Sequence, residues 1–107
     1  MDTWGLLGLD MAEHRAVALV GAGGKSSTMY ALARQARDTG RTVIVTTTTH
    51  IMPHPRLPLT DDPDPERLRT LLARHGVITL GRFLRPDKLS EAGSVAVCRA
   101  VAGVVIA

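Results

Sequence analysis

A glycine-rich turn between an apolar run and a helical pattern constrains this 107-residue chain more than any other feature. The segment Val17–Gln35 reads VALVGAGGKSSTMYALARQ and holds three glycines and a lysine at this junction. Ala16–Val20 is a continuous apolar run of strand length, typical of a strand buried on both faces of a parallel sheet. From Ser26 to Asp38, apolar residues recur three and four positions apart, which predicts an amphipathic helix that ends before Gly40. The buried positions of this helix are expected to be Met29, Leu32, Ala33 and Ala36.

We expect the turn between this strand and this helix to bind phosphate. Glycines accept unusual φ angles, and backbone N–H groups at the amino end of a helix attract an anion. In this interpretation Lys25 contacts the outer phosphates and the Ser26 hydroxyl ligates Mg²⁺. The candidate cofactor-binding residues of the turn are Gly21, Ala22, Gly23, Gly24, Lys25, Ser26 and Ser27.

The spacing of the glycines departs from the most common phosphate-binding pattern. G-x-x-x-x-G-K-[ST] needs a glycine at position 19, where the chain has Leu19. The shorter pattern present here, G-x-x-G-K-[ST], is the kind found in peptide ligases of cell-wall and folate synthesis. A dinucleotide-binding fold is an alternative, but it needs a third glycine where Ser26 stands and an acid after the second strand, where Thr46–Thr49 stand.

The remaining chain predicts further alternation of strands and helices. A short helix capped by Asp2 and running to about Gly8 is expected to bury Trp4 and Leu7. The predicted strands are Thr42–Thr46, Val77–Gly81 and Val104–Ala107; the predicted helices are Pro65–His75, between an Asp64 cap and Gly76, and Glu91–Val101; the predicted loops are Thr47–Asp64 and Arg82–Ser90. We therefore expect one α/β domain over residues 1–107, with a P-loop NTPase-like parallel sheet in three layers that is truncated after about four strands.

The threonine-rich segment after the second strand is a further candidate for the site. Open α/β sheets bind ligands at the carboxyl ends of their strands, so hydroxyls there can reach a phosphate oxygen or a metal-bound water. The candidate residues are Thr47, Thr48, Thr49 and His50. The alternative is that the threonines follow their strand preference and His50 is a solvated loop residue. A zinc site built on His50 and His54 is disfavoured, because Pro53 prevents the helix that would bring them together.

Composition excludes several classes of function. The net charge is +3 with scattered basic residues, and the aromatic residues are only Trp4, Tyr30 and Phe83, so we expect no nucleic-acid partner. Cys98 is the only cysteine, and the apolar Ala96 and Val97 before it predict a buried thiol, which fits a reducing cytoplasm. The amino terminus carries Asp2 where a secretory signal carries positive charge, so we expect a cytoplasmic protein. No apolar run approaches the roughly 20 residues that span a bilayer, so we expect no membrane partner.

The acidic residue that Mg²⁺-dependent phosphoryl chemistry requires is missing from the strand ends. The predicted strands end in threonine, in Gly81 and at Ala107. Either the acid lies beyond Ala107 in a longer protein, or this chain binds nucleotide without turning it over. Catalytic residues are therefore unassigned, and a nucleotide hydrolase and a nucleotide-dependent transferase both stay open.

The segment Val17–Ile51, VALVGAGGKSSTMYALARQARDTGRTVIVTTTTHI, resembles the selenium-dependent molybdenum hydroxylase accessory protein family, the YqeC-type family associated with selenium cofactor biosynthesis. In that family a strand, a G-x-G-G-K-[ST] loop, a helix and a strand ending in T-T-T-H-I follow in this order. The resemblance implies that the glycine turn binds nucleotide phosphates and that Thr47–His50 line the same site. Family members are longer and continue from a strand like GVVIA into an E-A-D-G segment, so the chain looks like an amino-terminal fragment.

Three functions follow from these patterns. The first is a P-loop protein that binds ATP or GTP with Mg²⁺ and assists the maturation of a molybdenum hydroxylase, with that hydroxylase or its cofactor machinery as partner. The second is the amino-terminal fragment of an ATP-dependent amide ligase of the cell-wall or folate type. The third is a binding module that holds a phosphate-containing cofactor such as a pterin without hydrolysis.

Overall fold

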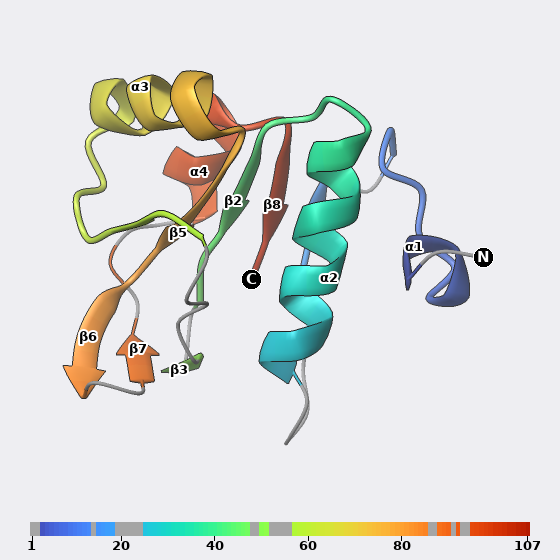
Figure 1. Cartoon of the computed structure of the whole chain (residues 1–107), viewed down its shortest axis with the longest axis horizontal. Coiled ribbons are helices and arrows are strands. Elements are labelled where there is room, and N and C mark those ends of the chain that lie inside the picture. The colour runs from blue at the N-terminus through green and yellow to red at the C-terminus, as the bar shows by residue number, and fades with distance from the viewer. Residues whose placement is uncertain are drawn as a thin grey trace.

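Five parallel strands form the central sheet of this protein, in the spatial order β1-β8-β2-β5-β4 (Figure 1). The computed structural model describes residues 3–13, 15–18, 25–47, 50–51, 57–85, 88–90, 92 and 95–107. The strands are β1 (Ala16–Val17), β2 (Val43–Val45), β4 (Leu59–Thr60), β5 (Val77–Leu80) and β8 (Val104–Ile106). All four neighbouring pairs are parallel, so the predicted α/β class with a parallel sheet is confirmed.

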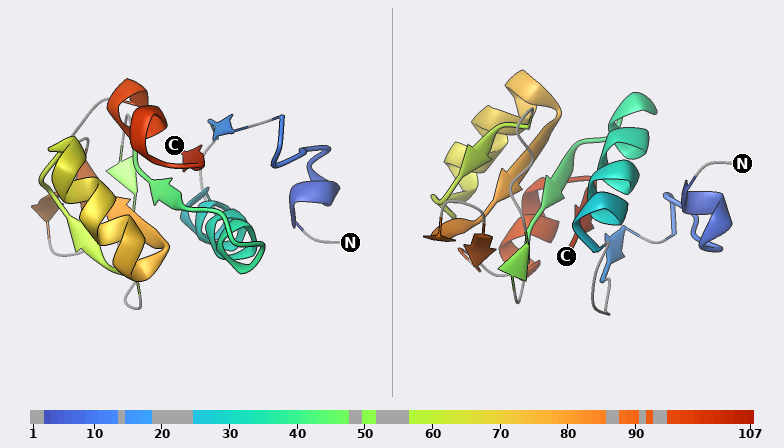
Figure 2. Two further views of the ribbon diagram at one scale, coloured as in Figure 1. Left: turned by 90° about the horizontal axis from the view of Figure 1, so that it is seen from above. Right: turned by 60° about the horizontal axis from the view of Figure 1, so that its bottom comes forward.

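Helices cover both faces of this sheet and produce three layers (Figure 2). Side chains alternate between the faces of a strand, so Val43 and Val45 join the apolar cluster of helix α2 (Lys25–Asp38). Ile44 between them belongs to the opposite cluster, which contains residues of α3 (Pro65–His75) and α4 (Val95–Val101). The inner strands of the sheet are therefore covered on both faces, which explains why their sequences are continuously apolar.

The ends of the two longer helices follow from their sequence as predicted. In α2, the four residues expected inside are fully buried: Met29, Leu32, Ala33 and Ala36. Gly40 (φ 89°) and Gly76 (φ 78°) reverse the chain after α2 and α3 in the left-handed region, which favours glycine. Before α3, the Asp64 carboxylate accepts a hydrogen bond from the Glu66 backbone N–H at 3.1 Å.

A short amino-terminal helix, α1 (Thr3–Leu6), packs against α2. Trp4 is buried as predicted, and its indole N–H donates to the Leu32 carbonyl oxygen at 2.9 Å. Thr3 and Gln35 exchange two hydrogen bonds of 3.0 Å. The prediction that Leu7 is buried is wrong, because α1 ends at Leu6 and the chain turns away, leaving 48% of Leu7 exposed.

A second, antiparallel sheet replaces the loop predicted over Arg82–Ser90. It contains β3 (His50–Ile51), β7 (Lys88–Ser90) and β6 (Arg82–Arg85), in that order. The strands β6 and β7 are two arms of a hairpin that follows β5, and Leu89 anchors them in the core with no exposed surface. The prediction failed because strands of two to four residues carry too little periodicity to be recognised.

Three further predictions need correction. The loop predicted over Thr47–Asp64 contains β3 and β4, which pair with β7 and β5. Helix α4 begins at Val95 rather than Glu91. The parallel sheet has five strands rather than about four, because β4 was not recognised.

Candidate functional site

The carboxyl ends of β1, β8 and β2 lie level with one another at one edge of the parallel sheet. Val17 pairs with Ile106, and Ile106 pairs with Val45. Beyond this row the ladder continues, because the Ala107 N–H donates to the Val17 carbonyl oxygen and the Thr46 N–H to the Ile106 carbonyl oxygen, both at 2.8 Å. Segments that follow these three strands therefore start side by side.

Helix α2 begins at the same edge. The chain leaves β1 at Val17 and enters α2 at Lys25, and α2 then runs back across the sheet toward the start of β2 (Figure 1). The first turn of α2 contains no acidic residue. The positive end of the helix dipole thus lies at the carboxyl edge, where an anion is stabilised.

Only part of the predicted site lies within the described residues. Gly21, Ala22, Gly23, Gly24, Thr48 and Thr49 lie outside them. The backbone of Lys25 and Ser26 forms the start of α2, and the backbone of His50 forms the start of β3. Ser27 is exposed in the first turn of α2, and Thr47 is fully buried just after β2. The fold therefore brings the starts of α2 and of the threonine segment to one edge.

Two buried threonine hydroxyls have no hydrogen-bond partner within the described parts of the chain. They belong to Thr46, directly after β2, and to Thr79, in β5. A buried hydroxyl without a partner costs roughly 1–3 kcal/mol, so such groups are uncommon and often mark a functional region. Thr46 lies at the carboxyl edge described above, whereas Thr79 pairs with Val45 inside the sheet.

Replacing the Thr79 hydroxyl by a methyl group is expected to stabilise the protein. Valine has the same shape as threonine, and Thr79→Val removes an unpaired polar atom from the core. We expect the free energy of unfolding to rise by about 1 kcal/mol, measured by urea denaturation.

Thr42→Val is the matched control for this substitution. The Thr42 hydroxyl accepts a hydrogen bond from the Gly103 N–H at 2.9 Å, so its removal should lower the free energy of unfolding. If Thr79→Val destabilises the protein as much as Thr42→Val does, the Thr79 hydroxyl has a partner and this interpretation is wrong.

The remaining polar candidates have structural roles or lie away from this edge. Burial raises the pKa of the Cys98 thiol to about 11, which confirms the predicted buried thiol and keeps it protonated at neutral pH. Among the described residues, no three His, Cys, Asp or Glu side chains gather closely enough to hold a metal ion. Asp62 and Asp64, near the far strand β4, cap backbone N–H groups. None of the helices described here has the length and apolar character needed to cross a membrane.

Sequence reasoning missed the position of β8 between β1 and β2. The Val104–Ala107 run was recognised as a strand, but a strand order is set by pairing between residues far apart in the chain, such as Val17 and Ile106. Thr79 was also missed, since nothing in the VITL sequence of β5 distinguishes its hydroxyl from a satisfied one.

These observations define the chain as a three-layer α/β protein whose candidate ligand site is the carboxyl edge of a parallel sheet beside a helix amino terminus. A family model described as YqeC protein matches residues 17–106. The chain belongs to this YqeC family, which confirms the resemblance found in Val17–Ile51. Neither the curated proteins nor the solved structures that were compared gave a match.

Proposed function

We propose that this chain is a nucleotide-binding accessory protein that takes ATP or GTP with Mg²⁺ in a P-loop NTPase-like site. The observation that carries the proposal is the position of the α2 amino terminus. It lies at the edge where β1, β8 and β2 end in register, directly after a segment with three glycines. Backbone N–H groups at such a junction favour the negative charge of phosphates.

The residue types at this junction suit a magnesium nucleotide. Lys25 follows the last glycine and supplies an ammonium group for the outer phosphates, and Ser26 supplies a hydroxyl for Mg²⁺. The buried Thr46 hydroxyl, which has no partner within the described chain, adds a polar group at the end of β2. A Mg²⁺ ion held there through the Ser26 hydroxyl would offset the negative charge of the phosphates.

The biological role we propose is assistance in the maturation of selenium-dependent molybdenum hydroxylases. Membership of the YqeC family supports this role, because the resemblance in Val17–Ile51 is to proteins associated with selenium cofactor biosynthesis. The proposed partner is a molybdenum hydroxylase or its cofactor machinery. The proposal concerns nucleotide binding, and the reaction that the nucleotide drives is left open.

A titration with fluorescent ATP and GTP derivatives tests the proposal. We expect saturable binding that unlabelled nucleotide reverses and that chelation of Mg²⁺ weakens at least about fivefold, a change of about 1 kcal/mol. Ser26→Ala should bind nucleotide with an affinity that no longer depends on Mg²⁺. Absence of saturable binding of either nucleotide, with or without Mg²⁺, would reject the proposed function.

A further inference from the structure

The small antiparallel sheet continues directly from the carboxyl edge of the parallel sheet. Strand β6 begins at Arg82, immediately after Gly81, whose N–H donates to the Thr60 carbonyl oxygen at the end of β4 at 3.0 Å. Strand β3 begins three residues after Thr47, the buried residue that follows β2. Figure 1 shows the small sheet and the start of α2 at the same end of the parallel sheet. The small sheet therefore borders the edge where the candidate site lies.

One row of residues in the small sheet lies nearest to that edge. Ser90, the last residue of β7, pairs with His50 on one side and with Arg82 on the other. His50 and Arg82 are the first residues of β3 and β6. Two strand spacings separate them, which corresponds to about 10 Å. The register thus brings an arginine from a predicted loop into one row with His50, a predicted residue of the site.

Arg82 and Lys88 lie on the same face of the small sheet. Side chains alternate along a strand, so Lys88 and Leu89 of β7 are on opposite faces. Phe83 pairs with Leu89 and shares its face, so the preceding residue, Arg82, is on the face opposite to Leu89 as well. Leu89 is fully buried in the apolar cluster of α2. The face with the two cations is therefore turned away from that cluster, with Arg82 exposed and Lys88 half-buried.

The hairpin of β6 and β7 carries a positive charge. From Arg82 to Ser90, the sequence contains three basic residues and one acidic residue, Asp87. Lys88 is two positions from Ser90, the residue opposite Arg82, so Arg82 and Lys88 are diagonal neighbours. Such neighbours lie about 7–8 Å apart, a separation that lets two long side chains reach the same anionic group.

We propose that this face binds the oxyanion of a second small substrate, a carboxylate or a phosphate, beside the nucleotide. Guanidinium and ammonium groups form charge-assisted hydrogen bonds to such oxygens. A protein partner fits less well, because a stable interface takes roughly 20–30 residues on each side and these strands have two, four and three residues. The description of the ligand as a second substrate rests on the proposed function, whereas oxyanion binding by Arg82 and Lys88 does not.

Titration of the ¹⁵N-labelled chain with sodium phosphate and with sodium acetate tests this proposal. Nucleotide is left out, so that the result does not depend on the proposed function. We expect at least one of the two anions to shift the amide resonances of residues 82–85 and 88–90 in a saturable manner, and sodium chloride at equal ionic strength to leave them unshifted. Tighter binding of phosphate would indicate a phosphorylated substrate, and tighter binding of acetate would indicate a carboxylic acid.

Arg82→Gln/Lys88→Gln should weaken this binding by about tenfold or more. Arg67→Gln/Arg74→Gln is the matched control, because it removes the same charge from exposed positions of α3 and should leave the affinity unchanged. Unchanged amide resonances of α2 and α4 in the absence of added anion would show that both variants keep the fold.

Two results would overturn the proposal outright. The first is that neither anion shifts the amides of the hairpin, and the second is that Arg82→Gln/Lys88→Gln binds the anions as tightly as the unchanged chain. Phosphate shifts confined to residues 25–28 would also overturn it, while supporting the proposed nucleotide site. Failure of this proposal and failure of the proposed function are therefore distinguishable.

Discussion

Lys25→Ala is expected to weaken nucleotide binding by about 10- to 100-fold. Lys25 is the first residue of α2, at the edge where the neighbouring strands end, and the proposal places its ammonium group against the outer phosphates. A hydrogen bond to a charged group contributes about 1.5–3 kcal/mol, which corresponds to this loss of affinity. Isothermal titration with ATP and GTP in the presence of Mg²⁺ measures the change.

Arg34→Ala is the matched control for Lys25→Ala. Arg34 is an exposed cation on the same helix, nine positions after Lys25, which corresponds to about 13.5 Å along the helix axis. Its removal lowers the net charge equally, so any general electrostatic effect appears in both variants. Equal affinities for Lys25→Ala and the unchanged chain would remove Lys25 from the site, and equal losses in both variants would show that only net charge matters.

Trp4→Ala is expected to lower the free energy of unfolding by about 3–5 kcal/mol. Trp4 is 2% exposed and packs against α2, and its indole N–H donates to the Leu32 carbonyl oxygen. The substitution leaves a cavity in the main apolar cluster and leaves that carbonyl oxygen with one hydrogen bond fewer. Such a loss is a large part of the stability of a domain of this size, and urea denaturation measures it.

Leu6→Ala tests whether the effect belongs to the Trp4 contact or to the short helix in general. Leu6 is in α1 as well, but 70% of it is exposed, so its truncation should change the free energy of unfolding by less than about 0.5 kcal/mol. Trp4→Phe keeps most of the apolar area and loses the hydrogen bond, so its cost should lie between the two. Equal costs for Leu6→Ala and Trp4→Ala would contradict the packing described for α1.

Local patterns predicted the two longer helices, α2 and α3, well because the causes of their ends and buried faces lie within a few residues. The spacing of Met29 and Leu32 specifies which side of α2 is buried, and Asp64 and Gly76 specify where α3 begins and ends. Strand order depends on contacts between distant residues, so the insertion of β8 between β1 and β2 could not be read from the Val104–Ala107 run. The small antiparallel sheet was not predicted for a different reason, because its strands are too short to show periodicity.

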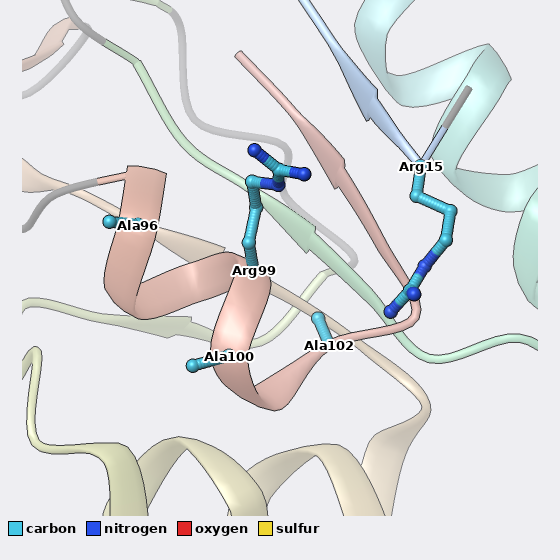
Figure 3. A pocket seen from close by; sticks show the side chains of 5 residues that line it. All are labelled: Arg15, Ala96, Arg99, Ala100 and Ala102. Atoms are coloured by element: carbon cyan, nitrogen blue, oxygen red, sulfur yellow. The ribbon is translucent and has the colours of Figure 1, made fainter. Parts of the chain in front are cut away.

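The candidate site likewise has features that the sequence predicts and features that only the structure shows. The sequence alone predicts a glycine-rich turn in which Lys25 comes just before a helix. The structure adds that this helix starts at the carboxyl edge of the sheet. The pocket of about 370 Å³ beside α4 (Figure 3) could not be predicted, because its lining residues Arg15 and Arg99 lie far apart in the chain and are brought to one pocket only by the pairing of β1 with β8.

We propose that nucleotide phosphates bind at the edge formed by the ends of β1, β8 and β2 and the start of α2. Amide hydrogen exchange of the unchanged chain, with and without saturating ATP and Mg²⁺, tests it most directly. We expect slower exchange in residues 18–28 and 46–51, with little change in α3 and α4. Unchanged exchange across both segments, or slowing confined to residues 95–102, would contradict it.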